Sequence, residues 1–561
     1  MDDKSDIKKL FELGVKNFKD KNFLNASQNF EKVLEHIPED ETILENLALS
    51  YFYSNNFKKV HENIKKIISL KKLNKKNLNL IIQFYRDLNK YEDYEKIIDT
   101  SNLINSFRKL ESYFFIPNFY HSSDKIEKYR KKLEKKLDLV LENSEKIELD
   151  VDSEKIDNPI FRLSYHNHNN LNINKKIVKT YRKIYPKLNQ KVFSGNENSK
   201  IKIGFISEYF TNHTIMKLFF GIMINLDFNK FEIIVFHSYK TLKSDLHSKI
   251  LEAEISKNLK NIYLSSKFNE NIDIIKNCNL DIIFYPDIHM SSDLYFLTYV
   301  KLAKYHLTSW GHPETTGNNN INFFLSSKLL EIDNAQTHYS EKLILSNYLP
   351  MYFYRPEISA DLEDANLKSR KIYSCLQTLI KIHPDFDEII KKILIKDKTG
   401  EILFIKDSKD ILAKSLLDRL SKKGIKDLDR IKFLDRLTTE EFIQQCGKAS
   451  VLLDPLYFGS GNSFHESMYY GTPTVSLPTN FLKSRIVMGA YKQMKIDDAP
   501  IVNNIDDYVE KSVELANLEE NKAIDFKKYL SSQAQKNLFE NKKFIKDLEN
   551  IFSKITENTY F

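Results

Sequence analysis

A glycine-rich turn followed by a carboxylate is the part of the sequence best suited to bind a ligand. The apolar run VLLDPL leads into a polar turn that contains Gly459, Gly461, Asn462 and Ser463. Glycines allow close approach of a ligand to the backbone, and free N–H groups at a helix start attract anions. A diphosphate at this helix start and a ribose diol on Glu466, one turn later, would form a nucleotide site. A glycine-rich connector with an ordinary N-cap fits the same spacing.

Other candidate ligand-binding patterns are less specific. The turn lacks the G-K-[ST] of a Walker loop and the third glycine of G-x-G-x-x-G. Two D-x-D triplets, Asp150/Asp152 and Asp427/Asp429, lie in polar segments, and we interpret them as surface charge. His166 and His168 have no Cys or carboxylate partner at metal-ligand spacing, so the sequence predicts no metal site.

Short apolar runs alternate with helical stretches from Lys200 onward. The first set of predicted strands is IKIGFIS, FEIIVFH, LDIIFY, KYHLTSW and NFFLSS, and the second, after an irregular stretch at 350–368, is KIYSCL, EILFIK, RIKFL, SVLLD and TPTVSLP. Such runs are typical of parallel sheets covered by helices on both faces. We therefore predict two Rossmann-like lobes at 200–365 and 366–545, and a C-terminal helix or tail at 546–561. The glycine-rich turn falls at the carboxyl end of a strand, where such sheets bind ligands.

The first hundred residues contain a repeat of about 34 residues, the tetratricopeptide period. Positions that recur at this step are Phe23, Phe57 and Tyr91, and also Phe30, Ile64 and Ile98. Stacked tetratricopeptide hairpins bury a shared core and leave a concave groove, whereas unrelated amphipathic helices are the alternative. We predict α-helical tetratricopeptide-like repeats over 1–105 and a helical linker over 106–199. One long linker helix should have an apolar face formed by Ile126, Tyr129, Leu133, Leu137 and Leu141.

Composition restricts the class of protein. A hydrophobic content of 42% in 561 residues indicates globular domains, and the net charge of +8 is spread along the chain rather than blocked. The three cysteines have no paired spacing, the first residues are charged, and no apolar run approaches the roughly 20 residues of a membrane helix. We therefore expect a cytoplasmic protein that binds neither nucleic acid nor membrane.

Four stretches, in the same order, resemble bacterial relatives of O-GlcNAc transferase in glycosyltransferase family 41. They are GFISEYFTNHTI, TSWGHPETTGNNNINFFLSS with NAQTHYSEKLI after it, CLQTLIKIHPDF, and GSGNSFHESMYYGTPTVSLPTNFLKSRIVMGAYKQM. The resemblance covers 160–545 well and the N-terminal repeats more loosely. It implies a GT-B fold and an inverting, metal-independent transfer from a UDP-sugar to a protein side chain.

The resemblance also implies roles on the nucleotide side of the site. Lys381 matches the family's phosphate-binding lysine, and Glu466 stands where the family has a ribose-binding aspartate. Gly461, Asn462 and Ser463 occupy the place of His-Thr-Thr in human-type relatives, so backbone N–H groups must do more of the binding. Gln377 lies four residues before the lysine rather than three. Phe442 falls where some relatives have a histidine near the uracil, and it either stacks on the base or packs in the core.

On the sugar and acceptor side, His213 matches the family histidine that faces the sugar. The near-neutral pKa of an ordinary histidine suits a general base, and a role in positioning or in a proton relay is also compatible. The turn that approaches the donor sugar comprises His312, Pro313, Thr315, Thr316 and Gly317. His289 ends another strand on the same rim and either lines the cleft or is structural.

These observations predict a UDP-sugar-dependent protein glycosyltransferase that requires no metal or other cofactor. We expect GlcNAc to be transferred to Ser or Thr of an acceptor protein that binds in the repeat groove. Transfer of glucose from UDP-glucose to Asn is the alternative. A UDP-sugar epimerase would share the two lobes but need no repeat arm. A non-catalytic scaffold would have no reason to keep His213, Lys381 and the glycine-rich turn together.

Overall fold

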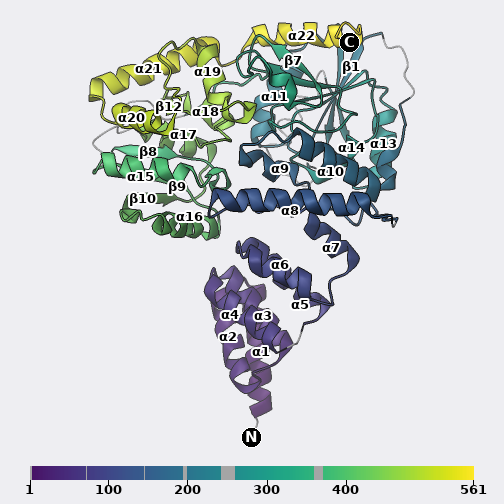
Figure 1. Ribbon diagram of the computed structural model, residues 1–561, viewed down its shortest axis with the longest axis vertical. Coiled ribbons are helices and arrows are strands. Elements are labelled where there is room, and N and C mark those ends of the chain that lie inside the picture. Colours follow the sequence, from purple (N-terminus) through teal and green to yellow (C-terminus); the bar gives the residue numbers. More distant parts are fainter. Residues whose placement is uncertain are drawn as a thin grey trace. The chain divides into compact units, whose positions relative to one another are not determined.

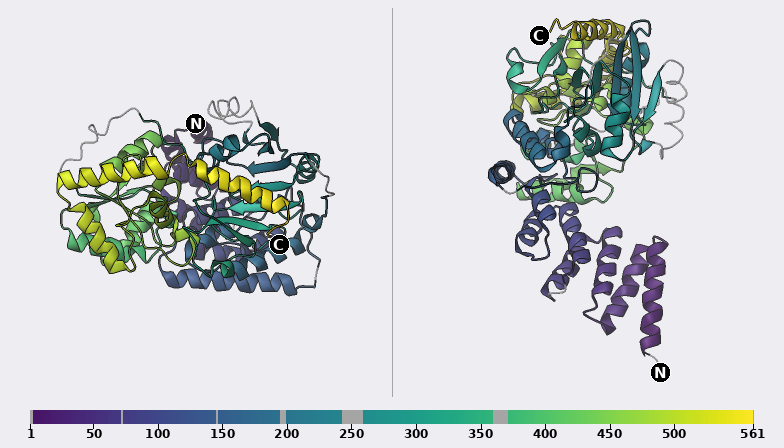
Figure 2. Two further views of the ribbon diagram at one scale, coloured as in Figure 1. Left: turned by 90° about the horizontal axis from the view of Figure 1, so that it is seen from above. Right: turned by 90° about the vertical axis from the view of Figure 1, so that its right-hand side faces the viewer.

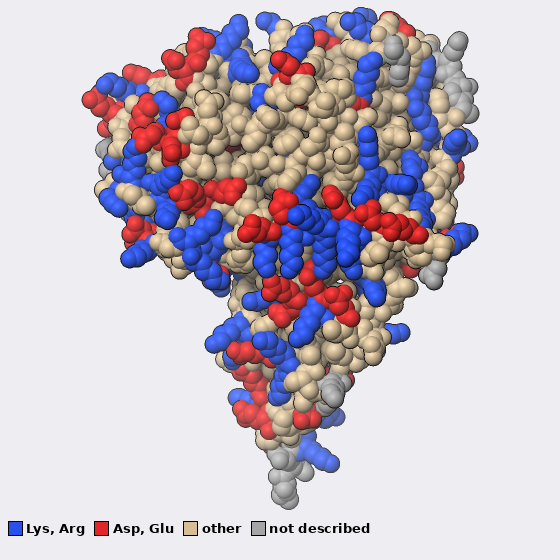
Figure 3. Space-filling model, viewed as in Figure 1, with Lys and Arg blue, Asp and Glu red and all other residues tan. Residues whose placement is uncertain are grey.

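The computed structural model describes residues 3–70, 73–144, 146–193, 199–241, 259–358 and 371–560. The chain divides into two compact units, Met1–Ser112 and Tyr113–Phe561 (Figure 1). Among the described residues, every helix is too short or too polar to cross a lipid bilayer. Charges of both signs are interspersed on the face shown in Figure 3, and basic side chains gather over helix α8 (Ser123–Glu142).

The N-terminal unit is built from helical hairpins, as predicted. Its helices are α1 (Asp3–Lys19), α2 (Phe23–His36), α3 (Glu41–Tyr53), α4 (Phe57–Ser69), α5 (Lys75–Asp87) and α6 (Tyr91–Thr100). Lys21, Asn55 and Asn89 occupy the same position in the three hairpin turns and adopt φ of 60°, 60° and 55°. Left-handed residues at the repeat step reverse the chain in the same way each time, and the hairpins stack on one another (Figure 2).

The linker contributes α7 (Ser106–Tyr113), α8, α9 (Ile160–Leu163) and α10 (Leu171–Ile184). Four of the residues predicted for the apolar face of α8 are buried, but Leu141 is only partly buried and Val140 takes its place. The period of 3.6 residues brings position 140 closer than position 141 to the line through Ile126 and Leu133. The predicted face is therefore correct except at its last residue.

The first lobe contains a seven-stranded parallel sheet in the order β3-β2-β1-β4-β5-β6-β7. Its strands are β1 (Ile201–Ser207), β2 (Phe231–His237), β3 (Lys260–Tyr263), β4 (Ile282–Tyr285), β5 (Tyr305–Ser309), β6 (Phe323–Ser327) and β7 (Lys342–Ser346). Helices α11 (Thr214–Asn225), α13 (Phe268–Lys276) and α14 (Ser292–Leu297) connect them. The five predicted strands are present, whereas the edge strands β3 and β7 were not predicted because they carry polar residues and are partly exposed.

The second lobe contains the predicted five-stranded parallel sheet, and the strand order is β10-β9-β8-β11-β12. Its strands are β8 (Ile372–Cys375), β9 (Glu401–Ile405), β10 (Ile431–Leu434), β11 (Val451–Leu453) and β12 (Thr474–Val475). The helices are α15 (Phe386–Lys396), α16 (Ile411–Lys422), α17 (Thr439–Lys448), α18 (Asn462–Ser467), α19 (Ile486–Met494), α20 (Ile505–Ala516) and α21 (Glu520–Asn537).

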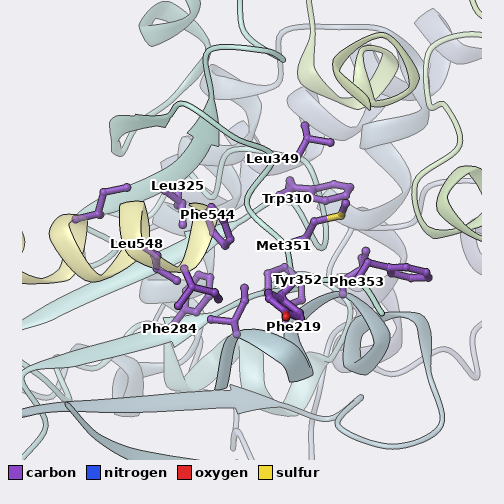
Figure 4. Packing of buried hydrophobic residues seen from close by; sticks show 14 of the residues in the cluster. Phe219, Phe284, Trp310, Leu325, Leu349, Met351, Tyr352, Phe353, Phe544 and Leu548 are labelled. Atoms are coloured by element: carbon purple, nitrogen blue, oxygen red, sulfur yellow. The ribbon is translucent and has the colours of Figure 1, made fainter. Parts of the chain in front are cut away.

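The last helix, α22 (Lys542–Thr556), returns to the first lobe. It begins four residues before the predicted boundary, and Phe544 and Leu548 pack in one cluster with Phe219 and Phe284 (Figure 4). Residues of α19 and α21 belong to the same cluster. This shared core joins the two lobes.

Candidate active site

The glycine-rich turn is held in place by Asp454, directly after strand β11. The carboxylate of Asp454 accepts hydrogen bonds from the Ser460 N–H and the Ser476 hydroxyl, both at 2.6 Å. A Cβ atom at Gly459 would lie 2.8 Å from Asp454 Oδ2, so this position requires glycine. Burial raises the pKa of Asp454 to about 6, against the opposing effect of the Lys381 ammonium.

Lys381 lies beside this turn, at the end of a 3-10 turn after strand β8. Its Nζ donates to Gln377 Oε1 at 2.9 Å and to the Gly459 carbonyl at 3.1 Å. Gln377 Nε2 in turn donates to Ser463 Oγ at 2.6 Å. The structure therefore joins Lys381, Gln377 and the glycine-rich turn in one network. Burial lowers the pKa of Lys381 to about 8.

The first turn of α18 receives no side-chain cap, because Gly461 occupies the N-cap position. Asn462 Oδ1 is buried and accepts no hydrogen bond from the described residues. Phe442 lies on α17, where it packs against the apolar group of Leu376, Cys446, Ala449 and Leu452. Phe442 therefore packs beside a cluster that includes the neighbour of Gln377 in the chain, and stacking on a base stays a prediction.

Glu466 is buried, and its partner comes from the other lobe. Lys217 Nζ, on α11, lies 2.6 Å from Glu466 Oε1 and 3.1 Å from Thr439 Oγ1 at the start of α17. Glu466, the residue predicted to bind the ribose, is thus linked to α11, the helix whose N-cap is His213. Lys217 was not identified from the sequence, because 249 residues separate it from Glu466.

His213 is the N-cap residue of α11, and its Nδ1 accepts the Ile215 N–H at 3.2 Å. Burial lowers its pKa to about 4, and the cations Lys217 and Arg436 act in the same direction. The ring is therefore neutral at pH 7. Since Nδ1 is an acceptor, we assign the single ring proton to Nε2. In this arrangement His213 offers a hydrogen-bond donor, which favours positioning over general-base chemistry.

His289 and His312 form a buried pair at the carboxyl edge of the first sheet. Their Nδ1 atoms lie 3.1 Å apart, and His312 Nε2 lies 3.4 Å from Ser164 Oγ. Burial lowers the pKa of His312 to about 3 and also lowers that of His289. The ring of His312 lies 6.3 Å from the ring of Phe458, which in turn lies 5.0 Å from Lys381 Nζ. The ring of Phe458 therefore contacts both His312 of the histidine pair and Lys381.

The rest of the predicted sugar-side turn makes structural contacts. Thr315 Oγ1 donates to Glu341 Oε2 at 2.7 Å, and the Thr316 N–H donates to Glu341 Oε1 at 2.8 Å. Gly317 has φ of 69°, and a Cβ there would lie 2.5 Å from the backbone of Asn174 on α10. Pro313 is buried in the same turn. The structure therefore places Thr315, Thr316 and Gly317 against the linker and Glu341, and brings His312 towards the second lobe.

A buried ion pair in the middle of this region was not predicted from the sequence. Lys483 Nζ lies 2.7 Å from Glu314 Oε2, and the two side chains are 1% and 7% exposed. The Lys483 carbonyl also accepts the Gly459 N–H at 2.8 Å. The pair thus connects the sugar-side turn of the first lobe with the glycine-rich turn of the second. In the sequence, the only sign of this ion pair was one charged residue in each of two stretches that carry family motifs.

In the described parts of the chain, no group of three or more His, Cys, Asp or Glu side chains is arranged as a metal site. Asp150 instead pairs with Lys187 at 2.8 Å, and Asp152 accepts the N–H of Phe268 at the start of α13. The donors that the structure gathers around the turn are the Lys381 ammonium, the Gln377 amide and backbone N–H groups. These groups suit an anionic ligand.

Two Rossmann-like lobes that share a core and face each other across this site define the GT-B class of fold. A mutant of the O-GlcNAc transferase of Thermobaculum terrenum has the same fold, with a TM-score of 0.67, 14% identity, and coverage of 100% of this chain and 99% of that one.

Sequence comparison points to the same group of proteins. The chain is 20% identical over 351 residues to a Solanum lycopersicum protein named "Probable UDP-N-acetylglucosamine--peptide N-acetylglucosaminyltransferase SPINDLY", covering 60% of this chain and 36% of that protein. It is 23% identical over 266 residues to the Arabidopsis thaliana protein of the same description named SEC, covering 45% and 27%. The chain thus spans about a third of the length of these curated relatives. No protein-family model matches it. The predicted resemblance to O-GlcNAc transferases is confirmed in sequence and fold.

Proposed function

We propose that the protein is a UDP-sugar-dependent protein glycosyltransferase that transfers GlcNAc to Ser or Thr side chains. The observation that carries the proposal is the network in which Lys381 contacts the glycine-rich turn and Gln377. The Lys381 ammonium and the backbone N–H groups of the turn lie close together, where they can stabilise the negative charge that grows on UDP as it leaves. The matched relatives, which are named as UDP-N-acetylglucosamine–peptide transferases, support the same donor.

The reaction we infer is a single displacement with inversion and without a metal. The acceptor oxygen forms its bond to the anomeric carbon while the bond from that carbon to the β-phosphate oxygen breaks. Lys381 and the turn stabilise the departing diphosphate, and Glu466 holds the ribose. His213 orients the substrate through its Nε2–H, and the proton of the acceptor hydroxyl passes to solvent water as the new bond forms.

The acceptor protein is proposed to bind in the groove of the N-terminal repeats. This groove has a volume of about 400 Å³ and is lined by Glu31, Leu34, Glu35, Leu47, Tyr51, Lys59, Glu62, Asn63 and Lys66. Both charge signs and an aromatic ring suit a polar peptide segment. The buried, unpaired thiols of Cys278, Cys375 and Cys446 support a cytoplasmic setting for this reaction.

Mass spectrometry tests the proposed function directly. Cell lysate treated with the protein and UDP-GlcNAc should contain proteins with added HexNAc on Ser or Thr, and lysate treated with the Lys381→Ala variant should not. A panel that includes UDP-glucose distinguishes the Asn-glucosylation alternative. An isomerised free UDP-sugar, or no modification with any donor, would contradict the proposal.

The proposed phosphate contact predicts a dependence of UDP affinity on pH. The pKa of Lys381 is lowered to about 8, so the ammonium is present below this pH and is lost above it. We expect UDP affinity to fall as pH rises through about 8, by up to about tenfold per pH unit, because binding selects the protonated lysine. Isothermal titration calorimetry between pH 6.5 and 9.5 measures this directly. A flat profile would contradict a charged Lys381–diphosphate contact.

A further inference from the structure

The ion pair between Lys217 and Glu466 connects the two lobes at the candidate site. Lys217 lies one helical turn after His213 on α11 of the first lobe, and Glu466 lies on α18, directly behind the glycine-rich turn of the second lobe. The distance from Lys217 Nζ to Glu466 Oε1 is 2.6 Å, and the same ammonium also contacts Thr439 Oγ1. A single side chain of the first lobe therefore holds two helices of the second.

The two partners differ in their access to solvent. The Glu466 side chain is 8% exposed, whereas that of Lys217 is 29% exposed. A carboxylate this deeply buried is unfavourable without a cationic partner, and Lys217 supplies that partner at 2.6 Å. A carboxylate has room for several hydrogen bonds. Within the described residues, only Oε1 of Glu466 accepts one from a side chain, and Oε2 is left for a ligand.

The Lys217–Glu466 pair also differs from the other ion pair that connects the lobes near the site. Lys483 and Glu314 are both almost fully buried, and Asn170 Nδ2 donates to the same carboxylate oxygen as Lys483. That pair is enclosed by protein, while the Lys217 side chain is 29% exposed. Of these two pairs, the Lys217 pair is therefore the one that a ligand can reach from solvent.

We propose that Lys217 is the positioning residue of the nucleotide site, which holds the Glu466 carboxylate in the orientation that binds the ribose diol of the donor. This inference rests on the proposed function, because it takes the ligand of Glu466 to be the ribose of a UDP-sugar. Through Lys217, the nucleotide bound on the second lobe is tied to α11, the helix that begins at His213. The donor is thereby held in a fixed position relative to the first lobe, which carries the sugar-side residues.

Calorimetry of the variants Lys217→Met and Lys217→Arg with UDP tests the proposal. The methionine variant should bind UDP roughly 10- to 100-fold more weakly, since one charged hydrogen bond is removed, and the arginine variant should stay within about threefold of the wild type. With UDP-GlcNAc as donor, KM should rise in the methionine variant while kcat changes by less than about threefold. If the methionine variant fails to fold, Lys217→Ala carries the same test, because it also removes both the charge and the hydrogen bond to Glu466.

A double-mutant cycle shows whether Lys217 acts through Glu466. In a Glu466→Gln background, which weakens UDP binding by itself, Lys217→Met should cause little further loss. The matched control is Lys422→Met, which removes an exposed ion pair to Asp418 of the same 2.6 Å length and should leave UDP affinity unchanged.

The outcomes separate the inference from the function on which it rests. A folded wild-type protein that binds neither UDP nor a UDP-sugar would refute the proposed function. Wild-type binding together with unchanged or tighter UDP binding by Lys217→Met would overturn the inference alone, because Lys217 would then be a bystander or a competitor for Glu466. Losses that add fully in the double variant would also overturn it.

Discussion

Replacement of Lys381 by alanine is expected to lower kcat for sugar transfer by about 10³-fold, the effect of removing a group that stabilises charge in a transition state. Lys381 provides the ammonium at the point where Gly459 and Gln377 converge. Without it, the charge that develops on the β-phosphate would be met only by neutral donors. The decrease should appear in kcat as well as in UDP affinity, because the leaving group gains charge as the bond breaks.

The measurement is the initial rate of transfer from radiolabelled UDP-GlcNAc to an acceptor found by mass spectrometry. Lys396→Ala is the matched control, because Lys396 lies in the same lobe on α15 and pairs with Glu510 on the surface. Circular dichroism and thermal unfolding should show that both variants keep their fold. Turnover of Lys381→Ala within tenfold of the wild type would refute the role assigned to this lysine.

Most of the fold could be predicted because the two sheets are built from continuous apolar strands. IKIGFIS and FEIIVFH became β1 and β2 with a full parallel register from Ile201 to Ser207. The strands that were missed, β3 and β7, lie at the two edges of the first sheet. An edge strand is covered less completely than a central strand, so its sequence lacks the apolar run on which prediction depends.

The candidate site was predictable where its residues are close in sequence or lie in a motif. Gln377 and Lys381 are four residues apart and form one contact, and the turn before Glu466 lies where a ligand site was expected. The partners of these residues were not predictable. Lys217 reaches Glu466 from the other lobe, and this contact is set by packing between the lobes, about which local sequence carries no signal. The Nδ1 of His213 instead accepts the N–H of Ile215, two residues further on, and the sequence alone does not show which ring nitrogen caps the helix.

The second large effect is expected on stability, at the buried pair of Lys483 and Glu314. Replacement of Lys483 by methionine should lower the free energy of unfolding by about 3–5 kcal/mol, because it leaves a buried carboxylate without its cation. Asn170 also donates to Glu314, at 2.7 Å, but an amide cannot neutralise the charge. Glu314→Gln should be similarly destabilising, since it leaves a buried ammonium whose pKa is already lowered by burial.

The double variant Lys483→Met/Glu314→Gln distinguishes charge burial from loss of packing. With both charges removed, most of the stability should return, because no unpaired ion is left in the interior. Urea unfolding followed by tryptophan fluorescence measures this in the unit that contains Trp310, which lies in the shared core of the lobes. As a control, Lys392→Met removes an exposed pair to Asp506 and should change stability by less than about 1 kcal/mol. If the double variant loses as much free energy of unfolding as the two single variants together, the packing of these side chains, rather than their charge, stabilises this contact between the two turns.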